Sequence, residues 1–145
     1  MILFSSELEF VFINKIKMNK LIIDVANKKF FLMIITSSNI YNITHENTKI
    51  NYEKLTIIIN DFLLSKNIKI TDINAIYINQ GSGSFAGIRN SMSVVKAFNV
   101  AKNIDYYCYN LNDFKDEKDL SYENIPNLCK KYKIKKNLIN PVYLS

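Results

Sequence analysis

The residues with the clearest chemical potential are gathered in one short segment. Gly81, Gly83 and Gly87 are the only glycines of this 145-residue chain, and its single arginine, Arg89, follows two residues later. Glycine permits backbone conformations and close approaches that other residues do not. Between a strand and the start of a helix, such a loop suits an anion or a neighbouring backbone. Ser84 adds a hydroxyl group to the same segment.

Several kinds of chemistry fit this segment poorly. The P-loop pattern GxxxxGK[ST] is absent, and a GxGxxxG variant of the dinucleotide fingerprint lacks an acidic residue after the next expected strand, which ends at Tyr109. Ser84 could serve as the nucleophile of a peptidase, but the only histidine, His45, lies in a different loop. With two cysteines, Cys108 and Cys129, the chain has too few ligands for a Cys/His zinc site, and we expect no metal.

Three interpretations of the glycine segment therefore stay open. It could be a tight strand-to-helix turn in which Gly87 lets the helix pack closely. It could be a degenerate nucleotide loop, or it could contact a partner protein.

The elements expected around the segment have a recognisable order. Short apolar runs predict strands at residues 21–25, 30–36, 40–44, 75–79 and 105–109. Helical periodicity predicts helices at residues 52–67, capped by Asn51, and at 88–103, with a weaker helix at 122–132. This order is that of an α/β ribonuclease-H-like half-domain with a mixed sheet, as in actin-type and sugar-kinase-type proteins.

The chain divides into three parts on this basis. Residues 1–17 form an N-terminal extension, or precede a true start at Met18. Residues 18–110 form the ribonuclease-H-like domain, and residues 111–145 form a polar C-terminal segment. We find no signal peptide and no apolar stretch near the roughly 20 residues that a membrane span needs. Two unpaired cysteines then indicate a reducing, cytoplasmic location.

The chain is basic, with a net charge of +6. A basic surface attracts tRNA or other polyanions. However, lysine is abundant throughout this sequence, so the charge alone is a weak signal. The densest basic stretch is a candidate for a weak tRNA contact and comprises Lys130, Lys131, Lys133, Lys135 and Lys136.

The glycine segment resembles the pattern G-P-G-S-F-T-G-x-R of the TsaB (YeaZ-type) family. Six positions match: Gly81, Gly83, Ser84, Phe85, Gly87 and Arg89. Ser82 stands in place of the proline and Ala86 in place of the threonine. The ending Pro141-Val142-Tyr143-Leu144 is also similar to that family. Two features depart from it: Asp24-Val25-Ala26 replaces Asp-Thr-Ser, which removes hydroxyls that would face a phosphate, and the second lobe is reduced to the stretch after Asn110.

The resemblance implies a role in making threonylcarbamoyladenosine in tRNAs that read ANN codons. TsaB proteins act there as non-catalytic scaffolds beside a larger paralogue, TsaD, which holds the metal. We accordingly expect no cofactor of this chain's own, with ATP or ADP at most at the junction with the partner. We also expect a homodimer when the partner is absent, and an indirect or weak tRNA contact. The alternatives are a degenerate nucleotide-binding module and a peptidase-like enzyme that uses Ser84.

The helices suggest where a partner would bind. In the 88–103 helix the apolar arc spans roughly 200°, about twice what a helix on a sheet needs. We therefore expect Ile88, Met92 and Val95 to contribute to a partner interface. On the preceding helix, Ile57 and Leu64 share one angle, away from the stripe that should face the sheet, and we expect them in the same interface.

Overall fold

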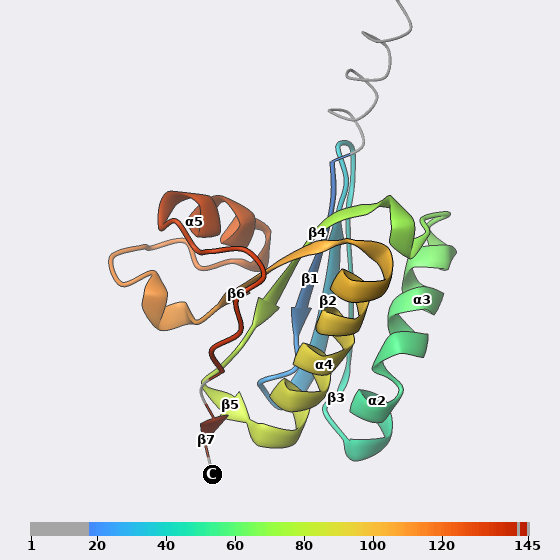
Figure 1. The fold of residues 1–145 in the computed structure, drawn as a ribbon, viewed down its shortest axis with the longest axis horizontal. Helices are drawn as coiled ribbons and strands as arrows, with labels where there is room; N and C mark the ends of the chain where they lie inside the picture. Colours follow the sequence, from blue (N-terminus) through green and yellow to red (C-terminus); the bar gives the residue numbers. More distant parts are fainter. Residues whose placement is uncertain (1–17, 142, 145) are drawn as a thin grey trace, which may run out of the picture.

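A five-stranded mixed sheet forms the centre of the computed structural model (Figure 1). The structure describes residues 18–141 and the backbone of residues 143 and 144, so the proposed extension at 1–17 lies outside the described residues. The strands are β1 (Asn19–Asp24), β2 (Lys29–Ile35), β3 (Ile40–Glu46), β4 (Ile73–Asn79) and β6 (Asp105–Tyr109). Their order in the sheet is β3-β2-β1-β4-β6.

The direction of the strands follows from the length of their connections. Short turns join β1, β2 and β3, which pair antiparallel. Helical crossovers join β3 to β4 and β4 to β6, and the pairs β1–β4 and β4–β6 are parallel. Parallel neighbours need such crossovers. This arrangement confirms the predicted ribonuclease-H-like α/β fold with a mixed sheet.

Helices cover both faces of the sheet (Figure 1). One face carries α2 (Lys49–Glu53), α3 (Leu55–Ser65) and α4 (Phe85–Lys102), and the other carries α5 (Ile125–Lys131). Short 3-10 turns lie at η1 (Ile70–Asp72), η2 (Leu111–Asp113) and η3 (Tyr122–Asn124). Two residues of the glycine segment, β5 (Gly83–Ser84), pair in parallel with β7 (Tyr143–Leu144).

The first predicted helix differs from the structure. Instead of one helix from 52 to 67 capped by Asn51, the chain forms α2 and α3 with a break at Lys54. Thr48 is the N-cap, because its Oγ1 accepts a hydrogen bond from the Asn51 amide at 3.3 Å. Asn51 lies inside α2 and its side chain donates to the Glu46 carbonyl at 2.7 Å. The helix therefore starts earlier than the periodicity alone indicated.

Alternation along the strands divides the core into two layers. Toward α3 and α4, the sheet presents aliphatic and aromatic residues such as Leu21, Ile23 and Leu32. Toward the C-terminal segment, the second layer is made of Ile22, Met33, Tyr77, Tyr109, Phe114, Ile125, Leu128 and Cys129. Part of the predicted polar C-terminal segment is thus a covering layer of the domain. Within residues 18–141, no helix combines the length and apolarity needed to cross a bilayer.

Candidate functional site: the glycine segment and its surroundings

The glycine segment joins the end of β4 to the start of α4, as predicted. The Ser84 hydroxyl caps α4 by accepting a hydrogen bond from the Gly87 amide at 3.4 Å. The Gly81 amide donates to Asn79 Oδ1 at 3.0 Å, and Gln80 Oε1 accepts from the Asn140 amide at 2.9 Å. The segment is therefore fixed both to its own strand and to the C-terminal segment.

Two of the glycines are required by close packing against the turn after β1. A Cβ atom at Gly83 would lie 2.3 Å from the Ala26 carbonyl oxygen, and one at Gly87 would lie 2.3 Å from the Val25 carbonyl oxygen. The Ser84 amide also donates to the Ala26 carbonyl at 3.0 Å. Real Cβ atoms do not approach backbone oxygens so closely, so only glycine fits here. The geometry favours the tight-turn interpretation, in which the glycines receive a neighbouring backbone.

Beside this turn, the buried carboxylate of Asp24 is held by a set of hydrogen bonds. Its Oδ1 accepts from the Ala26 amide at 3.0 Å, and its Oδ2 accepts from Asn79 Nδ2 at 3.2 Å and from the Tyr122 hydroxyl at 2.8 Å. Burial and the nearby Asp24 charge raise the pKa of Tyr122, which keeps the hydroxyl protonated as a donor. Sequence analysis missed Tyr122, because the two residues lie 98 positions apart.

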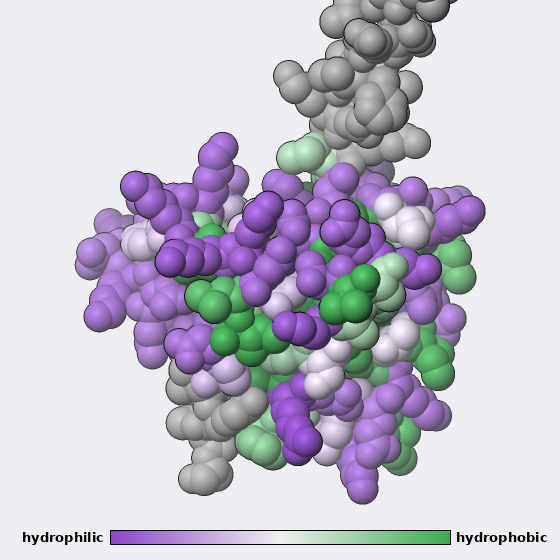
Figure 2. Space-filling model, in the orientation of Figure 1, coloured by the Kyte–Doolittle hydropathy of each residue, from purple (hydrophilic) through white to green (hydrophobic). Residues whose placement is uncertain are grey.

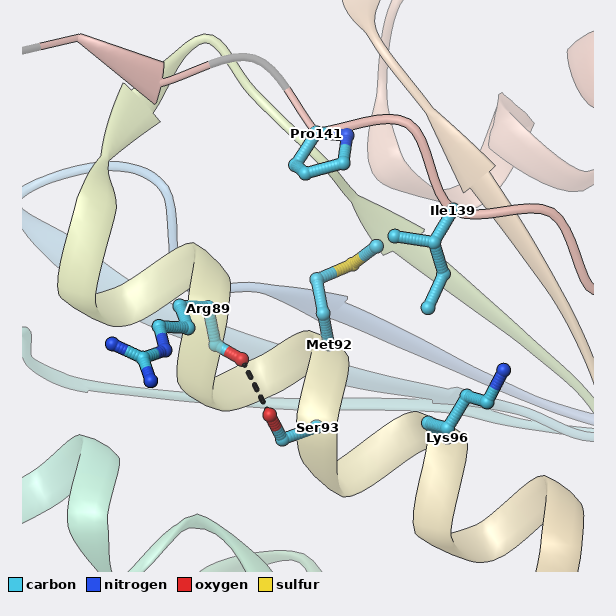
Figure 3. A pocket seen from close by; sticks show the side chains of 6 residues that line it. All are labelled: Arg89, Met92, Ser93, Lys96, Ile139 and Pro141. Carbon is cyan, nitrogen blue, oxygen red and sulfur yellow. Dashed lines mark hydrogen bonds between the residues drawn. The ribbon is translucent and has the colours of Figure 1, made fainter.

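Arg89 lies on the outer side of α4 between two hollows. One, of about 420 Å³, is lined by Arg89, Met92, Ser93, Lys96, Ile139 and Pro141. Figure 3 shows the Met92 side chain pointing toward the C-terminal segment and the Arg89 guanidinium turned away from it. In the same region, Figure 2 shows apolar surface where the C-terminal segment passes α4.

The second hollow, of about 270 Å³, lies between α2 and the start of α4 and includes Tyr52, Glu53 and Phe85 beside Arg89. The Arg89 guanidinium lies 5.9 Å from the centre of the Phe85 ring. Among residues 18–141, it forms no ion pair. Together with Lys96, Arg89 therefore makes this side of α4 positively charged.

The predicted partner interface needs a correction. Ile88, Met92 and Val95 are 0%, 5% and 1% exposed, and they belong to the core against the sheet. Their spacing of four and three residues places them on one side of the helix, and that side is the one that faces the sheet. Ile57 and Leu64 do point outward, with exposures of 60% and 58%. Of the five residues predicted for the interface, only Ile57 and Leu64, both on α3, are exposed; we call these two the outward apolar stripe.

Ser84 and His45, the two residues considered for a peptidase, lie in different surroundings. The Ser84 hydroxyl serves as a helix cap, whereas the His45 ring packs edge-on against Phe30 with a centroid distance of 5.7 Å. No hydrogen bond joins Ser84 and His45 within residues 18–141. Among the described residues, no three His, Cys, Asp or Glu side chains lie close enough together to hold a metal ion.

Comparison with known proteins gives a structural result. No protein-family model and no curated protein matches the sequence. YeaZ from Pseudomonas aeruginosa superposes with a TM-score of 0.60 at 16% identity, covering 64% of this chain and 44% of that one. An uncharacterized protein with similarity to peptidase YeaZ from Pseudomonas aeruginosa superposes with a TM-score of 0.60 at 14% identity, covering 69% of this chain and 49% of that one. The alignments thus span less than half of either YeaZ-type chain, and over this length the protein has the YeaZ-type fold.

Proposed function

We propose that this protein is a TsaB-type partner subunit of the machinery that forms threonylcarbamoyladenosine in tRNA. In this proposal it is a non-catalytic scaffold that binds a TsaD-type paralogue in the cytoplasm. The observation that carries the proposal is the glycine segment. Its six matches to the family pattern occur on a YeaZ-type fold, at the junction between β4 and α4.

The surroundings of Asp24 support a scaffold over a nucleotide-binding module. In the described structure both carboxylate oxygens accept hydrogen bonds, and Tyr122 lies directly against Oδ2. Gly83 and Gly87 are packed against the backbone of Val25 and Ala26. A phosphate group bound beside Asp24 would have to displace these contacts. We therefore propose that ATP or ADP, if bound, binds only at the junction with the partner protein.

The outward stripe of α3 supports a protein partner. Exposed apolar side chains reduce solubility unless a partner covers them. Ile57 and Leu64 lie seven residues apart on α3, which places them on one side of that helix. We propose that this stripe meets helices of the TsaD-type protein, and that it joins two copies of this chain when that protein is absent.

The test is co-purification with the TsaD-type protein of the same cell. Ile57→Lys with Leu64→Lys should leave the fold intact and abolish the complex. Burial of two such side chains contributes roughly 3–6 kcal/mol, and a buried lysine adds a desolvation penalty. The measurement is the amount of partner retained by tagged wild type and by the double variant at equal loading.

A matched control is available in the C-terminal segment. Leu120→Lys with Leu138→Lys introduces the same two charges at side chains that are 41% and 55% exposed but lie in the C-terminal segment. This variant should retain the partner. A wild-type chain that captures no TsaD-type protein would contradict the proposed function, and equal capture by both double variants would contradict the interface.

A further inference from the structure

A hollow of about 500 Å³ lies on the sheet face that is opposite α3 and α4. It is separate from the glycine segment and from the proposed partner stripe. Its floor comes from β1, β4 and β6, and its wall comes from α5 and the residues that follow α5. The lining residues are Met18, Lys20, Tyr77, Tyr107, Pro126, Asn127, Cys129, Lys130, Lys133 and Ile134.

The lining is positively charged. Lys20, Lys130 and Lys133 contribute three ammonium groups, and no Asp or Glu is among the lining residues. No ion pair involves these three lysines within residues 18–141. The hollow is therefore a concentrated positive site with no carboxylate of its own, which suits an anionic ligand.

The neighbouring lysines of the same basic stretch are in a different situation. Lys131 pairs with Glu117, and Lys136 pairs with Asp105 at 3.6 Å between Nζ and Oδ2. Their charges are balanced locally, and neither residue lines the hollow. Of the basic stretch, Lys130 and Lys133 thus line the hollow, whereas Lys131 and Lys136 are paired and Lys135 does neither within the described residues.

The floor of the hollow is aromatic. Tyr77 and Tyr107 are directly opposite each other on β4 and β6, and their rings stack with centroids 5.1 Å apart and planes 12° from parallel. Tyr77 is 8% exposed, whereas Tyr107 remains half-buried. A flat aromatic surface beside lysines matches what single-stranded nucleic acid offers, namely a stackable base and an adjacent phosphate.

We propose that this hollow is an RNA-binding site, in which Lys20, Lys130 and Lys133 contact phosphates and Tyr107 supports an unpaired base. The inference deepens the proposed function, because it gives this subunit a direct contact with the RNA substrate. A concave site does not suit a flat membrane surface, which basic side chains on a projecting face would contact better. An acidic peptide would match the charges but would leave the aromatic floor without a specific role.

The main test compares two triple variants of the full-length chain, measured without any TsaD-type protein. The first, Lys20→Gln, Lys130→Gln and Lys133→Asn, empties the hollow of charge. Asparagine is chosen at 133 because that residue has φ of 54°, a conformation that asparagine adopts readily. The second, Lys29→Gln, Lys131→Gln and Lys136→Gln, removes the same number of charges from ion-paired lysines.

Binding is followed by fluorescence anisotropy with a labelled oligoadenylate and with an unmodified tRNA transcript at several salt concentrations. The hollow variant should weaken binding at least about tenfold and should flatten the slope of log K against log salt by about 2, since each phosphate contact to a single strand contributes about 0.7. The paired-lysine variant should bind within about twofold of wild type. Equal loss in the two variants, or no loss in the hollow variant, would overturn the proposal.

Two further measurements identify the ligand class. Tyr107→Leu should weaken oligoadenylate binding about tenfold, and Tyr107→Phe should not, because stacking needs the ring and not the hydroxyl. Anionic vesicles and polyglutamate serve as competing polyanions. If either binds wild type more tightly than RNA does and loses affinity in the hollow variant, the site is not an RNA site. The uncharged Ile57→Gln, Leu64→Gln variant, which disrupts the α3 stripe without adding positive charge, should bind RNA like wild type, so failure of the two proposals can be told apart.

Discussion

The sheet has two faces, and they are closed by different kinds of side chain. Toward α3 and α4 the packing is apolar, with residues such as Ile23, Leu32 and Ile59 fully buried. Toward the C-terminal segment the layer contains several tyrosines, and next to it lies the hydrogen-bonded carboxylate of Asp24. We call the face covered by α3 and α4 the helix face and the other the C-terminal face. The stability of the helix face depends on the fit between nonpolar side chains, whereas the C-terminal face also depends on buried polar groups that must keep their hydrogen-bond partners.

The two faces of the sheet accordingly have different structural roles. The face covered by α3 and α4 fixes the position of the glycine segment, because Gly87 lets the start of α4 pack closely against the turn after β1. The C-terminal face closes over Asp24 with Tyr122 and forms the basic hollow with α5. If the comparison is correct, the two faces should respond differently to pH and to single substitutions.

High pH should produce the largest effect, and mainly on the C-terminal face. Burial raises the pKa of Cys129 and Cys108 from 9.0 to about 12, and it raises the pKa of Tyr77 and Tyr109 above the ordinary 10.0. Because these groups ionise more easily when unfolded, their stabilising contribution is present below pH 9–10 and is lost as pH rises further. The loss should total on the order of a few kcal/mol.

The order of events tests the comparison. Cys129, Tyr77 and Tyr109 belong to the C-terminal face, so protease should cut after Asn110 at a lower pH than it cuts in α3 or α4. Tyrosinate absorbance and limited proteolysis across the same pH series provide the measurement. Earlier cutting in α3 or α4, or full resistance at pH 12, would contradict the proposed difference.

Gly87→Ala should have the next largest effect, on the helix face. The new methyl group would meet the Val25 carbonyl oxygen, which is backbone and has little room to shift. We expect a loss of about 3 kcal/mol in the free energy of unfolding, measured by urea denaturation. Ser82→Ala, at an exposed position of the same segment, is the control and should change stability by less than about 0.5 kcal/mol. A Gly87→Ala protein as stable as this control would show that the segment is not tightly packed.

Tyr122→Phe should have the smallest of these effects. It removes the hydroxyl that donates to Asp24 Oδ2 at 2.8 Å and leaves a buried carboxylate oxygen with one donor fewer. The expected loss is about 2 kcal/mol. Tyr52→Phe removes the hydroxyl of a half-buried tyrosine, for which the described residues provide no hydrogen-bond partner, and it should be nearly neutral. Equal stability of the two variants in thermal unfolding would mean that Asp24 does not depend on Tyr122.

The elements of the fold were predictable to the extent that local signals define them. The β6 strand has the predicted ends, Asp105 and Tyr109, and the glycine segment joins β4 to α4 as expected. The predicted start of the first helix was wrong because Asn51 and Thr48 are both good capping residues, and in the structure Thr48 is the cap. The preference for Thr or Asn at a cap does not by itself decide between two such residues three positions apart.

The site was predictable only in part, because its remaining contacts are long-range. Periodicity places Ile88, Met92 and Val95 on one side of α4, but it does not say which side meets the sheet. The contact between Tyr122 and Asp24, and the grouping of Lys20 with Lys130, both join distant segments. Neither left a pattern in the sequence, where Lys20 and Lys130 are two lysines among many.

The most direct test of the central claim is a reconstituted tRNA-modification assay. Unmodified tRNA is incubated with the TsaD-type protein and the other factors of the same cell, and threonylcarbamoyladenosine is measured by mass spectrometry of the digested tRNA. We predict product when this chain is included with the other proteins. We predict no product when this chain is omitted, when it is the only protein added, or when it carries Ile57→Lys with Leu64→Lys. Undiminished product without this chain would contradict the claim that it is a required partner subunit.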